Sequence, residues 1–128
     1  GTDSVRGLVL REVSQAAALL GFSPAVRFAG PVDSVTTPML TDHLIAVVRE
    51  ALTNAAKHAR ANTVEILVQF ADGVLSLVVT DDGVGIGDGG RLSGLANITA
   101  RADELGGVCA VERVDESGST RLRWSVRL

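Results

Sequence analysis

Two alternating apolar stretches joined by a tight-turn signal constrain the fold of this chain more than any other feature. Apolar residues occupy every second position from 64 to 70 and again from 75 to 79, which is the pattern of β-strands with one buried face. Asp72-Gly73 lies between the two stretches and is typical of a hairpin turn, because glycine tolerates positive φ. The sequence therefore predicts a β-hairpin within a larger sheet.

Helical periodicity and strand alternation account for much of the remaining chain. Apolar residues recur close to every 3.6 positions in the helical segments, and glycines follow the first and third of them, as expected at helix ends. These helices are expected over residues 5–20, from an N-cap at Thr41 or Asp42 to Ala59, and over residues 95–105. Further strands are expected over residues 25–29, 108–114 and 120–128, and residues 81–93 are expected to form a loop.

The order of these elements predicts the fold class. Helices packed on one face of a sheet give two layers around one core, and 128 residues are enough for one such core. We expect residues 1–128 to form a single α+β domain, a two-layer α/β sandwich with three main helices on one face of a mixed five-stranded sheet. In the last strand the expected buried residues are Leu122, Trp124, Val126 and Leu128, with arginines between them facing water.

Composition excludes several classes of function. The net charge is -3 and the arginines are scattered, whereas nucleic-acid binding needs a basic stripe. Cys109 is the only cysteine, so an intrachain disulfide and a cysteine metal cluster are excluded, and we expect a small buried strand residue there. No apolar run approaches the roughly 20 residues that cross a bilayer, and no secretory signal opens the chain. We expect a cytoplasmic location without direct membrane contact.

Polar residues on the second expected helix are the first functional signal. At 100° per residue, Glu50, Asn54, Lys57 and His58 fall within about a quarter-turn of one another. Such a face is usually only solvated. Asparagine is a poor helix former, however, so Asn54 between alanines indicates a task for its amide oxygen.

Two glycine-rich boundaries supply the second signal. Asp81 ends an apolar strand and is followed by Gly83 and Gly85. The Asp81 carboxylate could accept a hydrogen bond from an exocyclic amine of a ligand. Aspartate and glycine also form ordinary turns, however. The third helix begins directly after Gly94, and the N-terminus of a helix suits phosphate groups. Arg101 on that helix could add positive charge, and Thr120 opens the last strand.

The order of these motifs resembles the Bergerat-fold ATPases, the superfamily of histidine kinases, gyrase, Hsp90 and MutL. Residues 49–59 and 94–107 are similar to the nitrate-sensor and DesK-type histidine kinases, with the actinobacterial haem-based dormancy sensors nearest. The resemblance covers residues 25–128. It implies the ATP-binding catalytic domain of a larger two-component sensor kinase.

The resemblance assigns roles to particular residues. Asn54 would ligate Mg²⁺ and Glu50 would orient or activate the attacking group. Asp81 would receive the adenine amine, with Thr120 near the adenine. The remaining residues assigned to the nucleotide are Lys57 and His58 on the phosphate side, Gly83 and Gly85 at the adenine wall, and Gly94 and Leu95 by the phosphates.

The implied chemistry is transfer of the γ-phosphoryl group of ATP to a histidine on separate dimerisation helices, with a response regulator downstream. These motifs contain no phosphoacceptor helix hairpin, so the domain is not expected to be active alone. The sequence departs from the family pattern at three places. Asp82 stands where the family often has asparagine and adds a negative charge. A second glycine near Gly94 is missing, and Thr99 stands where relatives often have arginine. A serine kinase of the anti-sigma-factor type and a nucleotide-binding module without phosphotransfer remain as alternatives.

Overall fold

The structure of the protein is a computed structural model that describes residues 4–56, 62–82, 98–113 and 120–128. Helices and strands alternate in the first half of the chain, and strands dominate the second. In chain order the elements are α1 (Val5–Leu20), β1 (Ala25–Ala29), α2 (Val32–Val35), α3 (Pro38–Asn54), β2 (Val64–Ala71), β3 (Val74–Asp81), β4 (Val108–Arg113) and β5 (Thr120–Arg127). A further helix covers the described residues 98–104 and is called the 98–104 helix below.

The strands form one mixed sheet, as the sequence predicted. Its strand order is β1-β2-β3-β5-β4; β1 pairs parallel to β2, and the other neighbours pair antiparallel. Asp72 and Gly73 join β2 to β3 with φ values of 54° and 78°. Two consecutive positive φ values belong to the hairpin turn whose twist matches that of the flanking strands, so the predicted hairpin is confirmed.

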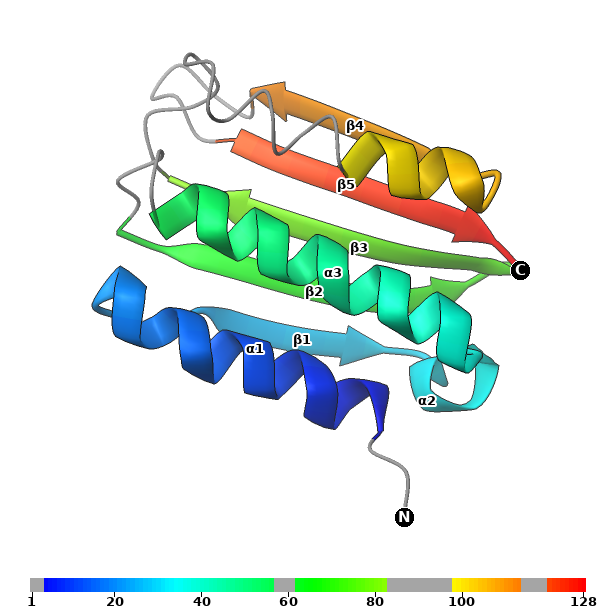
Figure 1. The fold of residues 1–128 in the computed structure, drawn as a ribbon, viewed down its shortest axis with the longest axis horizontal. Coiled ribbons are helices and arrows are strands. Elements are labelled where there is room, and N and C mark those ends of the chain that lie inside the picture. Colours follow the sequence, from blue (N-terminus) through cyan, green and yellow to red (C-terminus); the bar gives the residue numbers. More distant parts are fainter. Residues whose placement is uncertain (1–3, 57–61, 83–97, 114–119) are drawn as a thin grey trace.

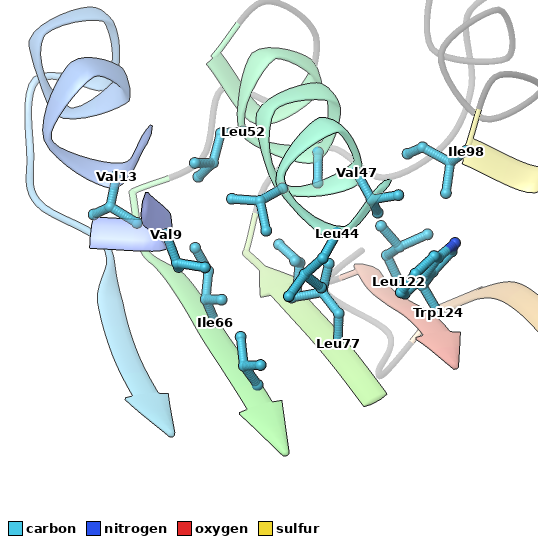
Figure 2. Close-up of a cluster of buried hydrophobic side chains, with 14 of the residues drawn as sticks. Val9, Val13, Leu44, Val47, Leu52, Ile66, Leu77, Ile98, Leu122 and Trp124 are labelled. Carbon is cyan, nitrogen blue, oxygen red and sulfur yellow. The ribbon is translucent and has the colours of Figure 1, made fainter. Parts of the chain in front are cut away.

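The helices lie on one face of the sheet, which confirms the two-layer sandwich. In Figure 1, α1 lies over β1, α3 over the middle strands, and the 98–104 helix, in yellow, over β4 and β5. Side chains from both layers interlock between them (Figure 2), with Val9 and Leu44 from the helices meeting Ile66, Leu77 and Trp124 from the sheet. No helix in the described part of the chain is long and apolar enough to cross a membrane.

One helix start, one short element and the burial of one residue differ from the sequence-based expectation. The helix expected to start at Thr41 or Asp42 begins at Pro38, because the Thr37 side chain accepts a hydrogen bond from the Leu40 amide at 3.2 Å and proline suits the first helical position. The four-residue helix α2 was not predicted, since so short a segment carries no periodicity. Leu128 was expected to be buried but is 49% exposed.

The end of the 98–104 helix was predicted correctly. Gly106 has φ 70°, its amide donates to the Asp103 carbonyl at 3.1 Å, and the Gly107 amide donates to the Ala102 carbonyl at 2.7 Å. This pair of bonds is the Schellman motif, which needs a left-handed residue that glycine adopts without strain. It turns the chain directly into β4.

Candidate functional site

One pocket brings together the end of α3, the end of β3 and the start of β5. Three polar residues there are buried, with exposed fractions of 6% for Asn54, 5% for Asp81 and 3% for Thr120. Apolar residues complete the lining of this pocket, which consists of Ala51, Asn54, Val79, Asp81, Ile98, Val111, Thr120 and Leu122. The polar groups therefore sit in an otherwise apolar pocket, the usual composition of a small-molecule site.

Asp81 and Thr120 continue the buried face of the sheet. Leu75, Leu77 and Val79 alternate inward along β3, and Asp81 takes the next inward position. Thr120 is its register partner on β5 and begins the inward series of that strand. A carboxylate on the core side of a sheet is costly unless it finds polar partners, so Asp81 is not an ordinary solvated turn residue.

Asn54 enters the same pocket from the helical layer. It is the last residue of α3, and its neighbours Ala51 and Ala55 are buried as well. A polar helix face is usually only solvated, but packing places this amide at the edge of the core, as the expected task of Asn54 requires. The small alanine side chains leave room beside it, since they extend no further than Cβ.

Glu50 lies one helical turn before Asn54 on α3, about 6 Å along the axis. It is half-buried and does not belong to the pocket lining. The structure thus brings Asn54, Asp81 and Thr120 together and leaves Glu50 beside them. The other predicted residues, Lys57, His58, Gly83, Gly85, Gly94 and Leu95, lie outside the described residues.

Asp82, the residue after Asp81, has a different partner set. Its carboxylate accepts hydrogen bonds from the backbone amides of Asn62 at 2.7 Å and Thr63 at 2.8 Å, just before β2. The hydrogen bond from Thr63, more than any other cause, holds the pKa of this carboxyl below its ordinary value of 3.8. Asp82 thus fastens the start of β2 to the end of β3, and its charge is directed at those amides.

The oxygen donors of the pocket suit a magnesium–nucleotide complex. Mg²⁺ prefers oxygen ligands and usually takes only one or two from protein, with phosphates and water supplying the others. The described residues contain no cluster of three or more His, Cys, Asp or Glu side chains, so a self-sufficient metal site is not formed by them. Asn54, with Glu50 one turn away, fits a metal held mainly by a bound phosphate.

Five apolar lining residues were not identified as site residues from the sequence. Each lies in an element that was predicted; they are Ala51, Val79, Ile98, Val111 and Leu122. All of them belong to the hydrophobic core or pack against it. Only the packing of the 98–104 helix against α3 and β4 shows that this part of the core borders a pocket.

Comparisons with known proteins found one matching ATPase family and several similar sensor proteins. The family model described as histidine kinase-, DNA gyrase B-, and HSP90-like ATPase matches residues 39–128. The nitrate/nitrite sensor protein NarX of Escherichia coli K12 is 39% identical over 83 residues, which are 62% of this chain and 14% of that protein. The sensor histidine kinase LiaS of Bacillus subtilis is 34% identical over 90 residues, 68% of this chain and 25% of that protein.

A solved structure agrees on the fold. The histidine kinase domain of the blue-light-activated histidine kinase from Erythrobacter litoralis superposes with a TM-score of 0.76 at 23% identity, over 98% of this chain and 61% of that one. At this identity the likeness concerns the fold alone.

The chain matches about a seventh to a quarter of the length of the two sensor proteins named above.

Proposed function

The chain belongs to the family of histidine kinase-, DNA gyrase B- and HSP90-like ATPases, and from that premise we propose that it is the catalytic, ATP-binding domain of a two-component sensor histidine kinase. Of the two relatives named above, LiaS is a sensor histidine kinase by its name and NarX is a sensor protein by its name. This favours the histidine kinase over a serine kinase and over a module without phosphotransfer.

The observation that carries this proposal is the buried Asp81 on the core side of β3. Its carboxylate lines the pocket beside Thr120 and Asn54, where an adenine ring would meet the apolar Ile98 and Val111. A carboxylate only accepts hydrogen bonds, so it suits the exocyclic amine of adenine. Thr120 has a hydroxyl that can donate to a ring nitrogen, directly or through water.

The phosphates would extend from this pocket past the end of α3. There Asn54 would offer its amide oxygen to Mg²⁺, and Glu50 would orient the group that attacks the γ-phosphorus. By family resemblance Lys57, His58, Gly94 and Leu95 belong to the phosphate side, and Gly83 and Gly85 to the adenine wall. The metal would neutralise charge on the transferring phosphoryl group, which is the main requirement of such reactions.

The acceptor would be a histidine on the dimerisation helices of the parent kinase. In-line transfer to its imidazole nitrogen breaks the bond between the γ-phosphorus and the bridging oxygen, and ADP leaves with that oxygen. A response regulator would then take the phosphoryl group from the parent. The task of this domain would be to hold the nucleotide and align it.

Titration calorimetry with Mg-ATP and Mg-GTP tests the nucleotide site. ATP should bind and GTP should bind poorly, because GTP would set a carbonyl oxygen against the Asp81 carboxylate. Asp81→Ala should weaken ATP binding by about 1.5–3 kcal/mol, as for a hydrogen bond to a charged group. Asn54→Ala should lose the magnesium-dependent part of the affinity while the helix stays folded, since alanine is the better helix former. Equal affinity for the two nucleotides would contradict the adenine assignment.

A further inference from the structure

A cluster of three polar side chains joins the two helices that flank the pocket. Arg101 on the 98–104 helix lies with Nη1 3.3 Å from Nδ1 of His43 on α3. The other ring nitrogen of His43, Nε2, lies 3.5 Å from Oε2 of Glu104. His43 is well covered, with 13% of its side chain exposed, whereas Glu104 is 68% exposed.

The partners of His43 determine which nitrogen of its neutral imidazole carries the proton. A guanidinium can only donate hydrogen bonds, so Nδ1 of His43 must be the acceptor. The proton of a neutral ring then resides on Nε2 and faces the Glu104 carboxylate. His43 therefore connects α3 to two side chains one turn apart on the 98–104 helix.

One nitrogen of the Arg101 guanidinium has its hydrogen-bond acceptor in His43. The Nε atom of Arg101 is buried and has no hydrogen-bond partner within the described part of the chain. Burial has thus removed water from this Nε–H group, and no protein acceptor in the described part of the chain replaces it. Removal of the His43 acceptor would leave a second nitrogen of this group unpaired, which is costly for a charged donor.

The 98–104 helix forms one wall of the pocket, so its position matters for a ligand. Ile98, at the start of its described part, is fully buried and lines the pocket with Asn54 and Asp81. Ala102 is fully buried one turn later, and both side chains belong to the hydrophobic core. These contacts hold the helix to the sheet, whereas the Arg101 and Glu104 contacts with His43 hold it to α3.

We propose that His43 is a positioning residue for the nucleotide pocket, acting through Arg101 to hold the 98–104 helix, and with it Ile98, at a fixed distance from Asn54. This inference rests on the proposed function, since it assumes that the pocket takes a nucleotide. It gives Arg101 a task other than charge at the phosphates, and it gives His43 a task other than accepting a phosphoryl group.

Two substitutions separate the contact from the bulk of the side chain. His43→Leu fills a similar volume and removes both polar contacts. His43→Asn keeps an amide oxygen near the position of Nδ1, so that Arg101 retains its acceptor. Asparagine and histidine have similar helix propensities and leucine is the better helix former, so a loss in His43→Leu would not come from a weaker helix.

The control is Thr37→Ala, which removes the N-cap of the same helix α3. Its expected cost is about 1 kcal/mol of stability, without any change at the 98–104 helix. A loss of affinity that arose only from a weaker fold would then appear in this control as well.

The measurements are Mg-ADP affinity by calorimetry and amide hydrogen exchange of residues 98–105 in the whole chain. His43→Leu should bind Mg-ADP about five- to tenfold more weakly, as expected for a lost hydrogen bond, and should exchange faster in 98–105. His43→Asn should restore both readouts to within about threefold of the parent chain, and Thr37→Ala should leave both near the parent values.

Parent-like Mg-ADP affinity in His43→Leu would overturn the inference while the proposed function stands. The positioning role would also be wrong if His43→Asn lost as much affinity as His43→Leu, or if Thr37→Ala lost as much. Failure of the parent chain itself to bind Mg-ADP would instead overturn the proposed function, and the positioning role with it.

Discussion

Asp81 and Asp82 are neighbours in sequence, but their carboxylates have different surroundings. Strand alternation sends Asp81 into the pocket and Asp82 outward, where it accepts hydrogen bonds from the amides of Asn62 and Thr63. The sequence suggested that an aspartate at position 82 adds negative charge near the nucleotide. In the structure its nearest partners are backbone donors, so its main effect should be on stability.

That effect should depend on pH with a definite sign. Because the pKa of Asp82 is lowered by these hydrogen bonds, the charged form stabilises the folded state. The contribution is fully present above the ordinary value of 3.8 and is lost as the pH falls through the lowered value. Asp82→Asn should therefore cost about 0.5–1 kcal/mol at pH 7, near the low end for a cap because the group is exposed.

Urea unfolding of the parent and Asp82→Asn between pH 7 and pH 2.5 measures this contribution. The difference in the free energy of unfolding should shrink as the pH falls below about 4. Asp72→Asn is the matched control, since it removes an exposed carboxylate from a turn position where asparagine also tolerates positive φ. A gap between the parent and Asp82→Asn that stayed constant down to pH 2.5 would contradict the assignment.

Single residues were predictable from the sequence where the strand pattern was regular. Asp81 follows inward-facing apolar residues at intervals of two and Thr120 precedes them, so their burial can be read from alternation. Asn54 could be placed on α3 but not at the core edge, because the docking angle of a helix is set by its tertiary neighbours. The partner of Arg101, His43, lies 58 residues away and no local pattern connects the two.

At the scale of elements, α1 is fastened to α3 by an ion pair of unequal partners. Arg49 donates to Glu12 through Nη2 at 2.6 Å and Nε at 3.2 Å. The Glu12 side chain is 9% exposed, while that of Arg49 is 63% exposed. The pair raises the pKa of Arg49 above its usual value through the hydrogen bond first and the charge of Glu12 second.

Because Glu12 is buried and Arg49 is exposed, substitution of the two residues should reduce the free energy of unfolding by different amounts. Arg49→Met strands a buried carboxylate and should destabilise the fold by about 1–3 kcal/mol. Glu12→Met removes the buried charge and leaves an arginine that water can solvate, so it should cost less than about 1 kcal/mol. Denaturant titration of both variants and of the double variant gives these values, and a larger cost for Glu12→Met would show that the pair is not controlled by desolvation.

Element boundaries were predictable where capping residues were unambiguous. The helix over residues 5–20 and its end at Gly21 were predicted correctly, and Gly21 has the left-handed φ of 83° that such a cap requires. The start of α3 was placed too late because apolar periodicity begins after Thr37 and Pro38, which carry the actual cap. The strand order, with β5 between β3 and β4, depends on pairing between distant segments and was not predicted.

At the scale of the whole molecule, the proposed kinase chemistry needs an acceptor histidine aligned with the bound nucleotide. The chain has two histidines. His43 accepts from Arg101, faces Glu104, and lies about 16 Å along the α3 axis from Asn54. His58 lies outside the described residues, and the family resemblance assigns it to the phosphate side of the nucleotide and not to the acceptor. We therefore expect the isolated chain to bind ATP without phosphorylating itself.

Incubation with γ-labelled ATP, followed by acid and base treatment, tests this expectation. Phosphohistidine is labile in acid and stable in base, so the two treatments identify the acceptor. Adding the parent's dimerisation helices, in cis or in trans, should produce acid-labile label on those helices, and His43→Asn should still support it because Arg101 keeps its acceptor. Acid-labile, base-stable label on the isolated chain would show that one of its own histidines reaches the nucleotide. Acid-stable label on an added partner protein would favour the serine kinase instead, because a phosphoserine ester survives acid.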